Sequence, residues 1–352
     1  MIDLDDARAV RAADPGGMLE AVVSLPRHCR EGWELGTGAA DLPAAEGVSA
    51  VAFCGMGGSA VAGDVMRTLY ADRLPVPLTV VRSPQLPASC GPDTLVIVSS
   101  YSGDTAETLA CFEEAVARRC RIVAVTSGGR LARRATELQT GLVRVPGGFM
   151  PRAALGYLAL GTLGALEAMG TIAPLRAELD EAVREMERLL DAIGPRVREG
   201  SNPAKALARR IGEQVPVIWG AEGIGAVAAA RWKTQLNENA KVPAFAAALP
   251  ELDHNEVVGW SEGRGAGFVL VALRHAGEHP QVAPRFPLSE ELARASGLEA
   301  EEVWAVGDSA LARLFTLIQH GDLVSTYLGL ARGVDPTPID AIARLKRALA
   351  ET

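Results

Sequence analysis

The chain has 352 residues, a formal net charge of -8 and a pI near 5.3, and its length suits two domains that each bury a core. Acidic and basic residues are interspersed without a basic stripe, which argues against nucleic acid as a partner. The chain starts without the basic and apolar regions of a secretory signal and contains no apolar run long enough to cross a bilayer. We therefore expect a cytoplasmic protein with no membrane partner.

The first residues show a mixed polar and apolar helical pattern, with a break at Pro15-Gly16-Gly17 and an exit at Leu42-Pro43. This pattern predicts an N-terminal helical arm over residues 1–46. From Val48 onward, short β-branched runs alternate with helical segments. The expected strands are Ala50–Cys54, Pro77–Val81, Thr94–Val98, Arg121–Val125 and Leu142–Val145. Strands separated by helices predict an α/β domain with a parallel, doubly wound sheet over residues 47–170.

Helices expected over 153–169 and 175–193 lead through a connector, residues 171–200, to a second domain at 201–352. That domain repeats the opening of the first, with a strand at 215–219, a glycine turn at 220–225 and a helix at 226–236, which suggests duplication. Further strands are expected at 267–273 and 303–307, and closing helices at 310–330 and 338–350. We interpret residues 245–249 as a loop and residues 275–287 as a surface insertion.

The cysteines are odd in number and form no CxxC pair, which predicts reduced, buried thiols. They are Cys29, Cys54, Cys90, Cys111 and Cys120.

Two loops of small residues, Gly55–Ala60 and Ser99–Thr105, each follow an expected strand and precede a helix. Glycines expose backbone N–H groups, hydroxyls add donors, and the helix dipole favours an anion, so the pair predicts a phosphate site. A single hydroxyl would be an ordinary helix cap, but three around Gly103 favour a ligand cradle. A dinucleotide site is disfavoured because Arg82-Ser83 replaces the ribose-binding acid, and a P-loop because no Gly-Lys-[Ser/Thr] follows the glycines.

A polar stretch in the second domain holds Glu238 and His254 in expected loops. Each alone would be an ordinary surface residue, but together they supply a base and a proton donor. Asp253, His254 and Glu256 could also be read as zinc ligands. Without a second histidine at ligand spacing, we expect no metal and no cofactor.

Five motifs in order carry a family resemblance. They are Gly55-Met-Gly-Gly-Ser-Ala-Val-Ala-Gly63, Ser100-Tyr-Ser-Gly-Asp-Thr-Ala-Glu-Thr108, Pro151-Arg-Ala-Ala-Leu-Gly-Tyr157, Asn237-Glu-Asn-Ala-Lys241 and His254-Asn-Glu256. Together they resemble the bifunctional phosphoglucose/phosphomannose isomerases of the sugar isomerase (SIS) superfamily. The resemblance implies two tandem flavodoxin-like SIS domains, a homodimer with shared active sites, and metal-free interconversion of aldose and ketose 6-phosphates.

The resemblance also implies roles for individual residues. The phosphate cradle falls on Gly57, Gly58, Ser59, Ser100, Ser102 and Thr105. Glu238 matches the base, Arg152 the stabiliser of the enediolate, and His254 the ring-opening histidine, which such dimers take from the neighbouring subunit. On looser matches, Lys346 assists ring opening and Thr337 makes room for the mannose epimer.

Asp104 departs from the family, which usually has Asn there, and it puts a carboxylate beside the expected phosphate. Repulsion would weaken phosphate binding unless this side chain points away or caps the helix. A sensor or regulatory protein that binds sugar phosphates without turning them over is the alternative function. Retention of Arg152, Glu238 and His254 argues against it, since binding alone requires none of the three.

Overall fold

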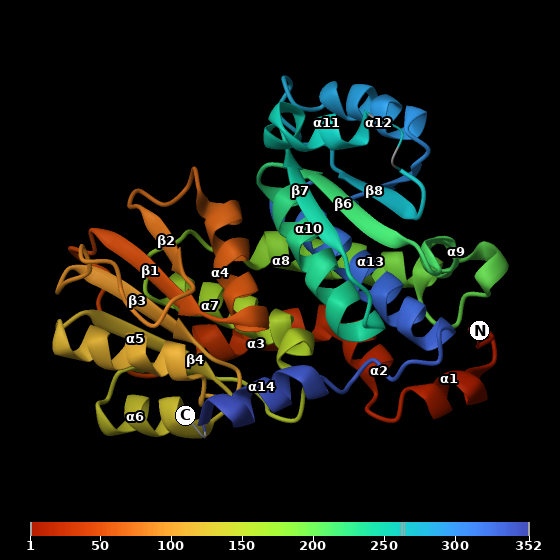
Figure 1. The fold of residues 1–352 in the computed structure, drawn as a ribbon. Coiled ribbons are helices and arrows are strands. Elements are labelled where there is room, and N and C mark those ends of the chain that lie inside the picture. The colour runs from red at the N-terminus through yellow and green to blue at the C-terminus, as the bar shows by residue number, and fades with distance from the viewer. Residues whose placement is uncertain (1, 262, 264, 351–352) are drawn as a thin grey trace. The chain divides into compact units, whose positions relative to one another are not determined.

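The computed structural model describes residues 2–261, 263 and 265–350, and the side chains of residues 346 and 350 lie outside that description. The chain divides into two compact units. We call Ser24–Glu187 with Gly307–Phe315 the first-sheet unit, and Met1–Val23 with Arg188–Val306 and Thr316–Thr352 the second-sheet unit. Each unit holds a parallel sheet flanked by helices (Figure 1).

In the first-sheet unit, the described strands pair in the order β2-β1-β3-β4-β5, which is the order of flavodoxin-like doubly wound sheets. The strands are β1 (Ala50–Gly55), β2 (Leu78–Val81), β3 (Thr94–Ser99), β4 (Arg121–Thr126) and β5 (Gly141–Arg144). The helices are α3 (Leu25–Thr37), α4 (Gly57–Tyr70), α5 (Ala106–Ala117), α6 (Gly129–Glu137), the 3-10 turn η1 (Pro151–Ala154) and α7 (Leu155–Ala168). These strands coincide closely with those expected, because their runs of Val, Ile and Leu are buried on both faces.

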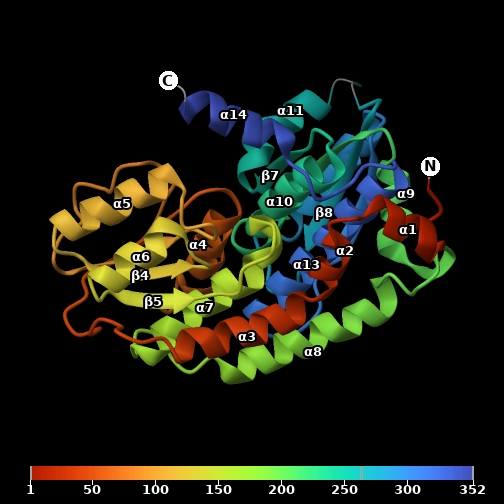
Figure 2. The ribbon, with the colours of Figure 1, turned by 90° about the horizontal axis from the view of Figure 1, so that it is seen from below.

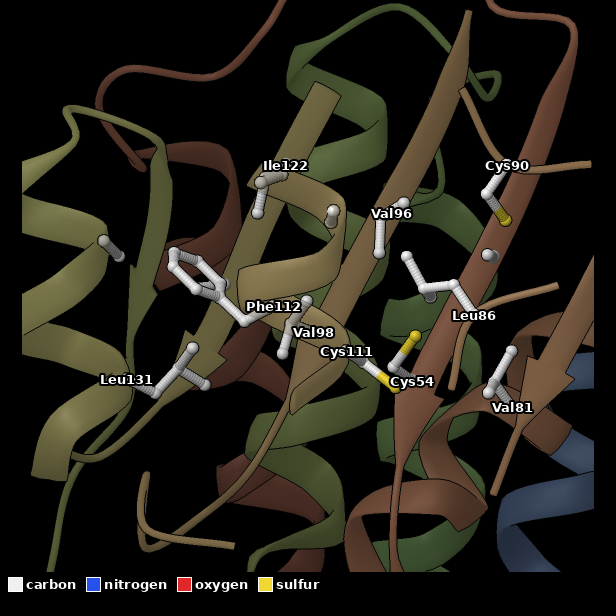
Figure 3. Close-up of a cluster of buried hydrophobic side chains, with 14 residues drawn as sticks. Cys54, Val81, Leu86, Cys90, Val96, Val98, Cys111, Phe112, Ile122 and Leu131 are labelled. Atoms are coloured by element: carbon white, nitrogen blue, oxygen red, sulfur yellow. The ribbon is translucent and has the colours of Figure 1, made fainter. Parts of the chain in front are cut away.

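Alternate residues of the central strands face opposite helical layers. On one face, Phe112 of α5 and Leu131 of α6 join the apolar cluster of Figure 3. On the other face, Phe53 packs against Gly63 of α4. The five cysteines are free thiols, four of them buried and Cys120 half-buried. The side chains of Cys54 and Cys111 lie next to one another inside the cluster (Figure 3).

The segment expected to be an arm contains α1 (Ala7–Ala13), α2 (Met18–Val23) and α3. Helix α3 packs closely against α7 (Figure 2), since glycines on both helices let the backbones approach. By contrast, the chain up to Val23, with α1 and α2, belongs to the second-sheet unit, where Lys205 Nζ donates to Leu4 O at 3.0 Å. The bounds of the two compact units therefore differ from the domain boundaries expected from the sequence.

In the second-sheet unit, the described strands pair in the order β7-β6-β8-β9, which repeats β2-β1-β3-β4. The strands are β6 (Val215–Ala221), β7 (Phe245–Leu249), β8 (Phe268–Arg274) and β9 (Glu299–Trp304). The helices and turns are α9 (Pro203–Ile211), α10 (Ile224–Gln235), η3 (Leu236–Ala240), η4 (Glu251–His254), α11 (Glu256–Trp260), α12 (Arg285–Ala295) and α14 (Asp340–Ala350), together with η2 (Glu199–Ser201). Helices α8 (Arg176–Ile193) and α13 (Ala310–Ala331) contribute residues to both units. Within the described residues, no helix is both long and apolar enough to cross a membrane.

Two strand expectations in this unit were wrong. Residues 245–249, expected as a loop, form the edge strand β7, although their alanines give no β-branched signal. The last strand lies at 299–304, whereas it was expected at 303–307. Its acidic residues interrupt the apolar pattern by which a buried strand is recognised in a sequence. Glu301 and Glu302 instead form ion pairs with Arg210 and Arg274.

The expectation of a surface insertion at 275–287 was wrong in part, because exposed residues alternate there with buried ones. Phe286 is completely buried in the core cluster of the second sheet, and Val282 is only 8% exposed. His275 is 5% exposed. The three prolines of this segment made it look like a loop, whereas Pro287 lies in the first turn of α12, where proline is tolerated.

Candidate active site

The first small-residue loop joins β1 to α4 at the carboxyl edge of the first sheet. Gly57 has φ +52°, a left-handed conformation that favours glycine, and it opens the helix. Gly58 packs directly against the backbone of Arg152. Ser59 is only 5% exposed, and its Oγ accepts a hydrogen bond from the N–H of Tyr101 at 3.2 Å. This bond ties the first loop to the second.

The second loop joins β3 to α5 and folds around its own hydroxyls. Ser100 Oγ donates to Thr105 Oγ1 at 3.1 Å and accepts from the N–H of Gly103 at 3.1 Å. Ser102 is exposed, and its Oγ accepts from the N–H of Asp104 at 3.3 Å. Because β1 and β3 are neighbours at the point where the strand order reverses, both loops lie at a topological switch point. The structure thus brings together the cradle residues that the sequence predicted.

A buried cation lies beside this cradle. Arg152 occupies the 3-10 turn η1, between β5 and α7, and is only 2% exposed. Burying a guanidinium in an apolar surrounding is unfavourable unless partners or a ligand compensate for its charge. The backbone of Arg152 packs against Gly58, which brings the turn that carries this arginine next to the first cradle loop.

The carboxylate of Asp104 is bound by Arg130. Its Oδ1 accepts from the backbone N–H of Arg130 at 3.0 Å and from that residue's Nε at 3.3 Å. Arg130 lies in the first turn of α6, so the carboxylate caps this helix. The charge beside the cradle is compensated by the arginine and the helix dipole.

Tyr101 was missed by sequence reasoning, although it lies between two cradle serines. Its phenol is 6% exposed, donates to Pro146 O at 3.1 Å and accepts from the N–H of Phe149 at 2.9 Å. Burial raises the pKa of this phenol. Tyr101 thus connects the second cradle loop to the segment that leads into the turn holding Arg152.

The second-sheet unit holds the expected base. Glu238 lies half-buried in η3, a π-helical turn that continues α10. Lys241 follows this turn with φ +58° and donates to the backbone carbonyl of Glu238. Its Nζ also donates to Pro336 O at 3.0 Å, which brings the loop of Thr337 next to the turn of Glu238. Lys346 lies in α14, and its side chain falls outside the described residues.

His254 ends the 3-10 turn η4, just beyond β7, and its side chain is exposed. Its neighbours are engaged elsewhere. Asp253 pairs with Arg285 at 3.0 Å, and Glu256 Oε1 accepts from the indole N–H groups of Trp219 and Trp260 at 3.1 and 3.2 Å. Among the described residues, no group of three or more histidine, cysteine or acidic side chains is arranged to hold a metal ion.

Comparisons with known proteins give this geometry a family context. The model of the bacterial phospho-glucose isomerase C-terminal SIS domain matches residues 200–349. A bifunctional phosphoglucose/phosphomannose isomerase of Caldicellulosiruptor bescii is 36% identical over 95% of this chain and 99% of its own length. Another, of Aquifex aeolicus, is 34% identical over 85% of this chain and 90% of its own.

Solved structures share the fold of this chain. A hypothetical protein of Thermus thermophilus superposes with a TM-score of 0.74 over 98% of this chain and 93% of that chain. At 20% identity, this likeness concerns the fold alone.

Proposed function

The chain belongs to the family of the bifunctional phosphoglucose/phosphomannose isomerases, and from this membership we propose that it interconverts glucose 6-phosphate or mannose 6-phosphate with fructose 6-phosphate without a metal ion. We assign each parallel sheet with its helices to one SIS domain. The observation that carries the proposal is the cradle, in which Ser59 and Tyr101 join two loops at a switch point beside the buried Arg152. Such a cradle suits the phosphate of a small sugar.

The reaction moves one proton between neighbouring carbons. In the open-chain aldose, Glu238 takes the proton from C2, the carbonyl electrons move to O1, and a cis-enediolate forms. A proton passes from the C2 hydroxyl to O1 through the cis-enediol, and the same carboxyl group returns the first proton to C1, which gives the ketose. Arg152 stabilises the negative oxygen of the intermediate, because a fixed cation costs no reorganisation during the step.

Ring opening precedes this proton transfer. We propose that His254, supplied by the second subunit of a homodimer, protonates the ring oxygen, and that Lys346 assists it. The exposed side chain of His254 is compatible with this role. Thr337 is proposed to make room for the mannose epimer.

The phosphate group remains bound by Gly57, Gly58, Ser59, Ser100, Ser102 and Thr105. It provides the orientation that places C1 and C2 for reaction.

A coupled assay tests the function. Purified, chelator-treated protein is mixed with fructose 6-phosphate, and glucose 6-phosphate and mannose 6-phosphate are followed separately. Turnover to either aldose supports the proposal and fixes the specificity. Binding of fructose 6-phosphate without turnover would instead favour a sugar-phosphate sensor.

A further inference from the structure

The segment that carries Glu238 has an unusual backbone. Residues Leu236–Ala240 form a π-helical turn directly after α10, and Lys241 ends it in the left-handed region. A π turn has i→i+5 hydrogen bonds, which insert an extra residue into the helical turn, and it is maintained only where its surroundings favour it. The contacts of this turn therefore decide where the carboxyl group of Glu238 lies.

The turn packs against α13 with almost no space between the two backbones. A β-carbon at Gly329 would come within 2.6 Å of Asn239 O and 3.3 Å of Ala240 Cα. Ala240 is 1% exposed. The glycine therefore allows the π turn to lie directly on α13.

A hydrogen bond from the turn to the helix fixes the register of this contact. Asn239 Nδ2 donates to Ser325 Oγ at 3.1 Å, and both side chains are completely buried. The serine hydroxyl in turn donates to the backbone carbonyl of Asp322 at 3.0 Å. The carboxylate of Asp322 pairs with the buried Arg231 of α10 at 2.8 Å. A continuous buried polar row thus runs from α10 through α13 to the residue next to Glu238.

The other neighbours of Glu238 are held as well. Asn237 Nδ2 donates to Val242 O at 2.8 Å, which closes the turn on itself. Lys241 connects the carbonyl of Glu238 to Pro336. Of these contacts, the bond to Ser325 joins the turn to a buried helix of the core, and rigid secondary structure sets the position of a reactive group more closely than a loop does.

We propose that the Asn239–Ser325 hydrogen bond positions Glu238 for proton transfer, an inference that rests on the proposed function. Ser325 touches no reacting atom and acts through Asn239. Loss of its hydroxyl lets the π turn shift while the phosphate cradle, on the other sheet, keeps its contacts. A displacement of about 1 Å in a reacting group can lower a rate by about 100-fold.

The chain offers a matched control next to Ser325. Thr326 is also completely buried on α13, and its Oγ1 donates to the same carbonyl of Asp322, at 2.7 Å. The variants Ser325→Ala and Thr326→Val each remove one buried hydroxyl bonded to this carbonyl. The pair therefore separates the bond to Asn239 from a general loss of buried hydrogen bonding in α13.

The experiment compares both variants with the wild type, using fructose 6-phosphate and its C1-deuterated form. We expect Ser325→Ala to lower kcat by about 10- to 100-fold, to leave KM within about twofold, and to raise the deuterium isotope effect on kcat, because proton transfer becomes more rate-limiting. Thr326→Val should keep kcat and the isotope effect near those of the wild type.

Two results would overturn the inference in different ways. If the wild type isomerises but both variants show equal kcat and isotope effects, Ser325 does not position the base and the proposed function stands. If the wild type shows no isomerisation, the proposed function fails and the positioning role fails with it. Thermal unfolding of all three proteins shows whether a fall in kcat reflects unfolding.

Discussion

Gly58 lies so close to Arg152 that a β-carbon at position 58 would come within 3.1 Å of the arginine's Cα and 3.2 Å of its backbone nitrogen. Both neighbours are backbone atoms, which cannot rotate away as a side chain can. The start of α4 and the turn η1 are therefore fitted to one another at the edge of the proposed phosphate cradle. The spacing of the cradle from its cation depends on the absence of a single methyl group.

The variant Gly58→Ala is expected to lower kcat by about 10-fold, because it moves Arg152 away from the developing negative charge. Stability should also fall, because forcing extra atoms into a close contact costs about 1–3 kcal/mol, more than the roughly 1 kcal/mol by which alanine is favoured over glycine in a helix interior. Gly91→Ala is the control, because a β-carbon there meets nothing within 4 Å. Steady-state kinetics and thermal unfolding of both variants check this, and an unchanged kcat for Gly58→Ala would contradict the proposed role of Arg152.

The variant Glu238→Gln removes the proposed base while keeping its size. We expect kcat to fall by about 100- to 10,000-fold, the range that positioned acid-base groups supply. Affinity for fructose 6-phosphate should change little, because the cradle lies on the other sheet. Steady-state kinetics measures kcat, and isothermal titration calorimetry measures the affinity for fructose 6-phosphate. A parallel loss of kcat and affinity would show that Glu238 is not the base.

The variant His254→Ala should impair the reaction of cyclic substrates more than that of 5-deoxyfructose 6-phosphate, which lacks the hydroxyl that closes the ring. The reason is that the imidazole is proposed to act only in ring opening. His279, an exposed histidine in the same unit, provides the control His279→Ala. Equal losses of kcat/KM on both substrates would show that His254 does not open the ring.

The variant Asp104→Asn tests whether the extra carboxylate weakens phosphate binding. Since Asp104 is held by the backbone and side chain of Arg130, its neutralisation should leave the Kd for inorganic phosphate within about twofold. The amide oxygen can still accept the bond that caps α6. Replacement by alanine removes that cap and should lower stability by about 1 kcal/mol. Phosphate titration that reveals much tighter binding by Asp104→Asn would contradict this account.

His28 should make stability depend on pH. It is completely buried, stacked on Tyr157 at 4.6 Å between ring centroids, and burial lowers its pKa from 6.5 to about 4. Between these values the unfolded chain binds the proton and the folded chain does not, so stability falls as the pH drops below 6.5. From pH 7 to pH 5 the loss is about 2 kcal/mol. Urea unfolding of the wild type and of His28→Phe at pH 7 and pH 5 checks this. Between these pH values, the free energy of unfolding should fall by about 2 kcal/mol less in the variant than in the wild type.

The two loops of the proposed cradle could be located from the sequence because their signals are local. Glycines and hydroxyls directly follow apolar strands, and a parallel sheet brings the ends of such strands together. The sequence did not reveal β7, whose alanines resemble a loop, or the buried Phe286, whose neighbouring prolines hide the start of α12. Ser325 was missed for a different reason. Its partner Asn239 lies 86 residues away, and only the tertiary fold joins the two.

Cysteines and tryptophans are distributed unevenly between the two units, so each unit has its own probe of unfolding. All the cysteines, at positions 29, 54, 90, 111 and 120, lie in the first-sheet unit, whereas four tryptophans, at 219, 232, 260 and 304, lie in the second-sheet unit. Buried thiols react with alkylating reagents only when the surrounding structure opens. Thiol labelling therefore follows the opening of one sheet, and indole fluorescence reports mainly on the other. Unfolding of the two halves can be timed separately in the unmodified wild-type chain.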